Sequence, residues 1–278
     1  MNNPLNNSYG RVVLITGASS GIGRRTAEEL AGCGFTVYGG SRRAVPIEGI
    51  TMLKLDVCSD SSIAAAVSEV INREGRIDIL INAAGNGICG AVEECSGDEA
   101  LFQMNTNYLG VVRMLNAVLP HMRRQMNGLV INVGSVGGIF SIPFQTMYSS
   151  SKYALEALTE GLRIELKPWG VKAALVEPGD TKTGFTAARL YSEKAKSSEY
   201  GIEFKNSLAQ MEKDEQNGMD ASRVTKVIFS LIKSKNPPVR RTVGYYKLLV
   251  FLKKLLPARL MEFILTLMYP KSGAAERK

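Results

Sequence analysis

Histidine and tryptophan are almost absent from this chain of 278 residues, which contains one of each. One histidine cannot form a metal centre that needs several, and it makes a histidine-dependent catalytic triad a poor expectation. Cysteine is sparse as well, and its spacing matches neither C-x-x-C nor a zinc site. Dispersed cysteines in a chain of this size indicate reduced thiols and predict a cytoplasmic protein without a metal centre. The four cysteines are Cys33, Cys58, Cys89 and Cys95.

Long apolar runs are missing too. Residues 1–10 are polar and lack the apolar centre of a signal peptide, so no secretory signal is expected. The net charge of +8 comes from basic residues that are scattered except near the C-terminus, and no nucleic-acid-binding motif is visible. We therefore expect no nucleic-acid partner. The length and the 45% hydrophobic content suffice for one large globular domain.

Short apolar runs alternate with helical patterns through the first two-thirds of the chain. The run at 12–15 is apolar on both faces, which is typical of a parallel strand covered by helices on both sides. This alternation predicts an α/β fold with a doubly wound parallel sheet of Rossmann type, which binds ligands beyond the carboxyl ends of its strands. Strands are predicted at 11–16, 35–40, 51–55, 77–82, 128–134 and 171–176, and helices at 22–33, 59–73, 101–126 and 147–167.

The alternation ends after Pro178. Residues 180–219 are polar and poor in strand signal, so they predict a mobile substrate loop with a short helix. A further helix is predicted at 220–233, and Pro237 and Pro238 follow it. We therefore expect a single dinucleotide-binding and catalytic domain at 1–236 and an apolar C-terminal helical extension at 237–278.

A glycine-rich turn joins the first predicted strand to the first helix. Gly17, Gly21 and Gly23 permit a tight turn and a close approach of the backbone to a ligand. The helix N-terminus then offers free N–H groups and a partial positive charge to a pyrophosphate. Such a turn is by itself equally a structural connection, and the motifs downstream favour a cofactor site. The predicted cofactor contacts in this turn are Gly17, Ser19, Ser20, Gly21, Ile22 and Gly23.

Two arginines, Arg42 and Arg43, follow the second predicted strand, where a ribose 2′-hydroxyl would need an acidic residue. This exchange is expected for a 2′-phosphate and predicts NADP(H) rather than NAD, although a solvated arginine pair would look the same. Asp56, followed by Val57, is a further candidate cofactor contact that would accept a bond from an adenine amino group. The same carboxylate would equally serve to cap the helix that begins near Ser59.

Tyr148 and Lys152 lie four residues apart on the predicted helix at 147–167, so both side chains point from one face. A free tyrosine has a pKa of about 10, and a neighbouring cation lowers the pKa toward the range of a general acid–base catalyst. The pair alone is weak support for a site, because most such pairs are surface coincidences.

With these residues assembled, the chain resembles the short-chain dehydrogenase/reductase family over about 11–183, and its character is closest to the hydroxysteroid and retinol dehydrogenase-like members. The motifs occur in the family's order along the chain. They are the glycine turn, Asn82-Ala83-Ala84-Gly85, Asn107-Tyr108-Leu109-Gly110, Ser135, Tyr148 with Lys152, and Pro178-Gly179.

The resemblance implies a role for each catalytic residue. Tyr148 exchanges a proton with the substrate oxygen, Lys152 lowers the phenol pKa and binds the nicotinamide ribose, and Ser135 orients the carbonyl. Asn107 would hold a water that passes protons to solvent, although a buried amide that satisfies helix carbonyls is the alternative. The remaining implied cofactor contacts are Asn82, Ala83, Gly85, Pro178, Gly179, Thr181 and Thr183, with Thr181 where the family usually has a branched apolar residue.

The C-terminal extension contains two apolar helical patterns, at 245–256 and 260–268, separated by Pro257. Neither pattern is long enough to span a bilayer, and basic residues interrupt both. Three interpretations stay open. The helices complete a core or dimer interface, line the entrance for a hydrophobic substrate, or lie on a membrane surface through 244–269.

The leading hypothesis is an NADP(H)-dependent oxidoreductase that interconverts a secondary alcohol and a ketone, or an alcohol and an aldehyde, on a bulky apolar substrate such as a steroid or retinoid. A 3-oxoacyl thioester reductase would share every catalytic motif. A non-catalytic, membrane-associated NADPH-binding module is the alternative from another class. We expect a homodimer or homotetramer in the cytoplasm, with peripheral membrane contact as an option. A hydrolase is excluded, because Ser135 lacks the first glycine of a G-x-S-x-G elbow.

Overall fold

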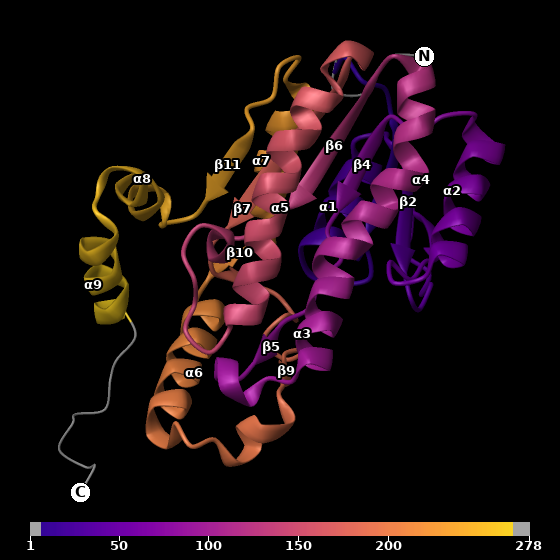
Figure 1. Ribbon diagram of the computed structural model, residues 1–278. Coiled ribbons are helices and arrows are strands. Elements are labelled where there is room, and N and C mark those ends of the chain that lie inside the picture. The colour runs from indigo at the N-terminus through magenta and orange to yellow at the C-terminus, as the bar shows by residue number, and fades with distance from the viewer. Residues whose placement is uncertain (1–6, 269–278) are drawn as a thin grey trace, which may run out of the picture.

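A seven-stranded parallel sheet forms the centre of the computed structural model, which describes residues 7–268. The strand order is β11-β7-β6-β4-β1-β2-β3, and every neighbouring pair is parallel (Figure 1). This arrangement confirms the predicted doubly wound sheet. All six predicted strands are present, with ends that differ by at most two residues. The strands are β1 Val12–Thr16, β2 Thr36–Ser41, β3 Thr51–Lys54, β4 Ile79–Asn82, β6 Gly128–Val133, β7 Val171–Pro178 and β11 Arg240–Val243.

Helices cover both faces of the sheet, which explains why its strands are apolar on both sides. On β1, Val12 and Leu14 pack with helices α2, α4 and α5, whereas Val13 and Ile15 pack with α1 and α7. Two separate cores result, one on each face. The helix bounds are α1 Gly21–Gly32, α2 Asp60–Glu74, α4 Gly110–Gln125, α5 Thr146–Glu165 and α7 Ala221–Lys233.

The strand order reverses between β1 and β4, because the chain runs outward from β1 to β3 and then continues on the other side of β1. This reversal opens a crevice at the carboxyl ends of the strands. Thr16, Asn82 and Asn132 lie in register there on β1, β4 and β6. The predicted site residues follow these strand ends and are therefore brought together.

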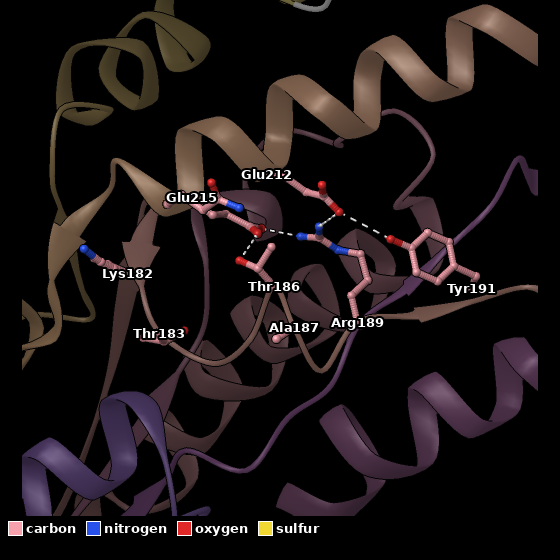
Figure 2. A pocket seen from close by; sticks show the side chains of 9 residues that line it. Lys182, Thr183, Thr186, Ala187, Arg189, Tyr191, Glu212 and Glu215 are labelled. Atoms are coloured by element: carbon pink, nitrogen blue, oxygen red, sulfur yellow. Dashed lines mark hydrogen bonds and ion pairs between the residues drawn. The ribbon is translucent and has the colours of Figure 1, made fainter.

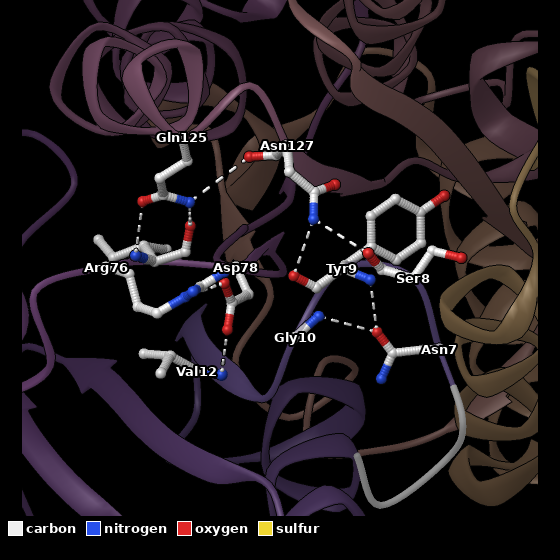
Figure 3. Close-up of polar contacts among 10 residues, drawn as sticks. Asn7, Ser8, Tyr9, Gly10, Val12, Arg76, Asp78, Gln125 and Asn127 are labelled. Atoms are coloured by element: carbon white, nitrogen blue, oxygen red, sulfur yellow. Dashed lines mark hydrogen bonds and ion pairs between the residues drawn. The ribbon is translucent and has the colours of Figure 1, made fainter. Parts of the chain in front are cut away.

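The opposite end of the sheet is held by polar contacts of the N-terminal segment (Figure 3). The buried carboxylate of Asp78 accepts a hydrogen bond from the Val12 N–H at 2.9 Å and pairs with Arg76 at 2.6 Å. Asn127 donates to the carbonyls of Ser8 and Tyr9 at 3.0 and 3.1 Å. These contacts hold together the end of the sheet that lies opposite the crevice.

Three segments differ from the predictions. The helix predicted at 101–126 is divided into α3 (Gly97–Met104), a π-helical turn (Asn105–Leu109) and α4. The segment 180–219 contains a longer helix than predicted, α6 (Gly201–Gln216), and β11 is a strand that the sequence analysis does not predict. Two short ladders also form, β5 (Ile88–Cys89) with β9 (Leu190–Tyr191) and β8 (Thr181–Lys182) with β10 (Met219–Asp220).

Two C-terminal helices, α8 (Lys247–Leu255) and α9 (Ala258–Met268), lie outside the sheet and its covering helices, beyond the edge strand β11 (Figure 1). They match the two apolar patterns on either side of Pro257. Within residues 7–268, the helices are all too short or too polar to cross a bilayer.

Candidate active site

The glycine-rich turn between β1 and α1 packs closely against the loop that follows β4. Gly17 has a φ of +71°, and a Cβ on it would lie 2.8 Å from the Ala84 backbone. A Cβ on Gly23 would lie 2.4 Å from the Gly17 carbonyl oxygen. Ser19 and Ser20 are exposed in the turn, and no side chain caps the first turn of α1. The turn therefore offers backbone N–H groups to a pyrophosphate, as a dinucleotide requires.

Thr16 holds the turn and the β4 loop together, a role that sequence reasoning missed. Its buried hydroxyl oxygen accepts hydrogen bonds from the N–H groups of Ala83 and Ala84, both at 3.1 Å. Asn82 donates to the Asn132 side chain at 2.9 Å, which links β4 to β6. The only available signal for Thr16 was a hydroxyl residue at the end of an apolar strand.

Arg42 and Arg43 follow β2 at the same edge of the sheet and are both exposed. Within residues 7–268, neither guanidinium has an ion-pair partner. The buried Ser41 hydroxyl donates to the Arg43 carbonyl at 2.6 Å and fixes the start of this segment. The two cations are thus available for an anionic group such as a phosphate.

Asp56 and Val57 lie in the turn between β3 and α2. Asp56 accepts a hydrogen bond from the Cys58 N–H at 2.9 Å, and Ser59, not Asp56, caps α2 by accepting from the Ser62 N–H at 3.3 Å. Val57 packs against Gly110, where a Cβ would lie 2.9 Å from its side chain. The predicted adenine contact at Asp56 stays a prediction.

Tyr148 and Lys152 lie in the first turns of α5 and meet Ser135, which follows β6. The Lys152 Nζ is 5.8 Å from the Tyr148 ring centre and donates to the Val133 carbonyl at 2.9 Å. The Tyr148 hydroxyl is hydrogen-bonded with Ser135, whose Oγ also accepts from the Gly137 N–H at 3.0 Å. The structure therefore brings the three predicted side chains to one place at the crevice.

Both members of this pair have shifted pKa values. Burial is the main cause that raises the pKa of Tyr148 to about 12; the hydrogen bond with Ser135 opposes this shift and the Glu215 carboxylate adds to it. Burial also lowers the pKa of Lys152 to about 8. Loss of hydration on burial dominates the pKa of both groups, and the Lys152 ammonium donates to a carbonyl. That Lys152 lowers the pKa of the phenol stays a prediction.

The aromatic ring of Phe185 covers Tyr148. The two ring centres are 5.5 Å apart, and a Cβ on Gly87 would lie 2.8 Å from the Phe185 ring. Thr183 accepts a hydrogen bond from the Phe185 N–H at 3.2 Å, and its side chain lies next to Gly21 of the phosphate turn. The loop after β8 thus connects the predicted cofactor turn with the catalytic pair. Sequence reasoning missed Phe185.

Asn107 lies in the π-helical turn and is fully buried. Its Oδ1 accepts from the Asn86 N–H at 2.9 Å, and its Nδ2 donates to the Asn86 carbonyl and to Ser151 Oγ, both at 3.0 Å. A Cβ on Gly85 would lie 3.4 Å from Asn107 Oδ1 and 3.8 Å from Lys152 Nζ. Asn107 therefore ties the β4 loop to α5 beside the lysine, and its water-holding role stays a prediction.

Pro178 ends β7, and Gly179, which follows it, is covered by the C-terminal segment. The Gly179 N–H donates to the Val243 carbonyl at 3.0 Å, and a Cβ on Gly179 would lie 2.5 Å from the Tyr246 ring. Thr181 donates to the Gly179 carbonyl at 2.8 Å. The chain near α8 therefore supports the loop that carries the predicted nicotinamide contacts.

A cavity of about 490 Å³ lies between the loop after β8 and helix α6 (Figure 2). The Arg189 guanidinium is buried on its wall, paired with Glu215, and lies 5.9 Å from the Phe185 ring centre. Thr186 donates to the same carboxylate at 2.6 Å. The sequence analysis predicted a substrate loop at this place and Thr183 as a site residue, but it did not predict Thr186, Arg189 or Glu215. The cavity is lined by Lys182, Thr183, Thr186, Ala187, Arg189, Tyr191, Glu212, Glu215 and Gln216.

Comparison with known proteins gives consistent matches. The family model described as short chain dehydrogenase matches residues 11–194. The 3-ketodihydrosphingosine reductase of Bacteroides thetaiotaomicron is 43% identical over 263 residues, which cover 93% of this chain and 98% of that protein. Human 17-beta-hydroxysteroid dehydrogenase type 1 is 41% identical over 63% of this chain and 58% of its own length. Bovine retinol dehydrogenase 8 is 33% identical over 89% of this chain and 86% of its own length.

Solved structures agree with the fold. A short-chain dehydrogenase from Streptomyces avermitilis superimposes with a TM-score of 0.80 at 30% identity, over 93% of this chain and 96% of that chain. ElxO with NADP bound superimposes with a TM-score of 0.70 at 25% identity, over 86% and 98%. That neighbour binds a nicotinamide cofactor, and the glycine turn and catalytic residues described above are of the kind that such a cofactor requires.

Proposed function

The chain belongs to the short-chain dehydrogenase family and is an oxidoreductase that acts on CH–OH or keto groups. From this premise we propose that it is an NADP(H)-dependent reductase of a ketone on a long, apolar substrate, with a 3-keto sphingoid base as the first candidate. The observation that carries the proposal is the convergence of Ser135, Tyr148 and Lys152 at the crevice where the strand order reverses.

The residues present fit the cofactor. The glycine turn would hold the pyrophosphate, Arg42 and Arg43 would hold a 2′-phosphate, and Lys152 would bind the nicotinamide ribose. When bound, the nicotinamide supplies the hydride of a reduction or accepts it in an oxidation. The free guanidinium groups after β2 support NADP(H) over NAD(H).

The chain's own residues handle the proton. Ser135 and Tyr148 would donate hydrogen bonds to the substrate carbonyl oxygen and fix its orientation. During reduction, the O–H bond of Tyr148 breaks as a new O–H bond forms on the substrate oxygen, and Tyr148 is left as a phenolate. The positive charge of Lys152, 5.8 Å from the ring, stabilises that phenolate.

The extent of the relatives' similarity supports the substrate class. The 3-ketodihydrosphingosine reductase matches 93% of this chain, whereas the human steroid dehydrogenase matches 63% of it. Retinol dehydrogenase 8 also matches most of the chain, at lower identity. A steroid or retinoid is therefore the second candidate. All of these substrates are largely apolar.

The test is NADPH oxidation with a panel of four ketones or aldehydes: 3-ketodihydrosphingosine, a steroid 17-ketone, retinal and an acetoacetyl thioester. We expect the highest kcat/KM for 3-ketodihydrosphingosine with NADPH, and a lower value with NADH. Tyr148→Phe should reduce kcat by about a thousandfold or more while NADPH binding persists. Tyr153→Phe, on the same helix, is the matched control and should retain activity.

Two results would contradict the proposal. One is preference for the thioester over the three lipophilic carbonyl compounds, which would favour a 3-oxoacyl thioester reductase. The other is tight NADPH binding without turnover of any compound, which would favour a non-catalytic binding module.

A further inference from the structure

Helices α8 and α9, with Tyr245 just before α8, expose seven large apolar side chains, which we call the C-terminal face. These side chains are between 45% and 85% exposed. Only Val250 and Met261 of the two helices are buried. Val250 of α8 and Leu265 of α9 pack in one cluster with Val136 and Phe140, which attaches both helices to the body of the protein. The face consists of Tyr245, Leu248, Phe251, Leu255, Leu260, Phe263 and Leu267.

Basic residues border the C-terminal face. Lys247, Lys254 and Arg259 are exposed, and Lys253 is half-exposed and donates to the Tyr153 hydroxyl at 2.7 Å. The only acidic residue of α8 and α9 is Glu262. Apolar side chains next to exposed cations match an anionic bilayer surface, where the former enter the acyl region and the latter meet lipid phosphates.

The charge pattern disfavours a second copy of this chain as the partner. A symmetric pair formed through the C-terminal face would place the basic residues of one copy near those of the other. Like charges at short distance repel, and burial between two proteins would strengthen the repulsion. An anionic surface removes this cost and uses the same cations favourably.

We propose that the C-terminal face docks this protein on an anionic lipid surface, as a peripheral contact. Helices α8 and α9 follow each other at the same side of the protein, beyond β11 (Figure 1). Each basic residue near such a surface strengthens partitioning by roughly fivefold. The four cations and seven apolar side chains therefore act together.

The C-terminal face also lies close to the catalytic residues. Val250 of α8 packs with Val136 and Phe140, and Val136 directly follows Ser135. Just before α8, Tyr246 donates a hydrogen bond to Asp180, next to Gly179. Membrane docking would therefore place the active site beside the phase in which a long-chain substrate is dissolved, a consequence that rests on the proposed function.

The experiment is co-sedimentation of the full chain with vesicles of phosphatidylcholine, with and without phosphatidylserine. We expect binding that needs phosphatidylserine and that weakens as salt rises. The triple variant Leu248→Ser, Phe251→Ser, Phe263→Ser should lose at least about tenfold in partitioning. The double variant Lys247→Glu, Lys254→Glu should lose the preference for phosphatidylserine. Val92→Ser and Lys54→Glu alter exposed side chains on other elements and should bind as the wild type does.

Circular dichroism and NADPH oxidation with a water-soluble short-chain ketone verify that each variant is folded. Equal sedimentation of the wild type and the triple variant would overturn the proposal. The proposal would also be overturned if the wild type were a dimer, the triple variant a monomer, and neither bound vesicles. The C-terminal face would then be covered by a second copy of the chain. Vesicle binding is measured without turnover, so a protein that binds vesicles but reduces no sphingoid ketone would refute only the proposed function.

Discussion

Replacement of Asn107 by alanine tests how the candidate site is held together. The side chain makes three hydrogen bonds and is fully buried, so water cannot take its place without a rearrangement. The three groups that bond to Asn107 differ in whether they keep another hydrogen-bond partner after the replacement. The Asn86 carbonyl still accepts from Gln103 at 2.9 Å, and Ser151 still donates to the Tyr148 carbonyl at 2.6 Å. The Asn86 N–H alone is left without an acceptor.

The expected loss follows from this difference. An unsatisfied buried N–H costs about 1–3 kcal/mol, and each of the other two lost bonds contributes about 1 kcal/mol. Asn107→Ala should therefore lower the free energy of unfolding by about 3–5 kcal/mol, a large part of the total for a single domain. Urea denaturation followed by circular dichroism measures this quantity.

Asn127→Ala is the matched control for this prediction. Asn127 donates two hydrogen bonds at the opposite end of the sheet, but it is half-exposed (Figure 3). Water can replace those bonds, so the loss should stay at or below about 1 kcal/mol. Equal losses for the two variants, or a loss below about 1 kcal/mol for Asn107→Ala, would refute the structural role assigned to Asn107.

Three further predictions concern the cofactor site and pH. Arg42→Ala with Arg43→Ala should raise the Kd for NADPH by about ten- to a hundredfold and leave that for NADH unchanged, as measured by fluorescence titration; an equal effect on both would contradict the 2′-phosphate assignment. Gly17→Ala should destabilise the protein and abolish NADPH binding, because its Cβ would lie 2.8 Å from the Ala84 backbone, whereas Gly97→Ala, which meets no atom within 4 Å, should do neither. The folded-state pKa of Lys152 of about 8 lies below that of a free lysine, so the unfolded chain binds the extra proton between pH 8 and roughly 10.4. The stability of the wild type relative to Lys152→Met should therefore rise with pH across this window, by up to about 3 kcal/mol, and a flat difference in thermal scans at several pH values would show that the lysine is not desolvated.

Most of the fold could be predicted because the parallel strands are buried on both faces. Runs such as Val12–Thr16 on β1 leave no polar face, and this pattern distinguishes them from helices and loops. The strand β11 was missed for the opposite reason. Its residue Arg240 looks solvent-exposed in the sequence, but it donates to Glu156 at 3.0 Å and lies 3.4 Å from the buried Glu177 on β7. Only the folded structure supplies these partners.

The helix predicted at 101–126 shows a second limit. Its apolar pattern continues from α3 through α4, so periodicity cannot reveal the π-helical turn at Asn105–Leu109 between them. This turn inserts an extra residue and directs Asn107 toward the β4 loop. The motif predicted that Asn107 matters, whereas its three hydrogen-bond partners could not be foreseen.

The spacing of Tyr148 and Lys152 predicted their common face correctly but not their protonation. A spacing of four residues on a helix places two side chains on the same face, whereas their pKa values depend on the groups packed around them. Here Phe185 covers Tyr148, and Arg189, held by Glu215, lies beyond that ring. We expect a substrate that approaches the Tyr148 hydroxyl to move Phe185, because the two rings are in contact.

Displacement of Phe185 would also change the chemistry of the pair. Once the ring leaves, polar groups of the substrate and solvent replace part of the apolar cover that raises the Tyr148 pKa. The charged form of Lys152 becomes easier to maintain for the same reason. We therefore expect the loop after β8 to link substrate entry to proton transfer, because the buried Tyr148 is a weak acid, whereas a Tyr148 that contacts polar groups of a substrate releases its proton more readily.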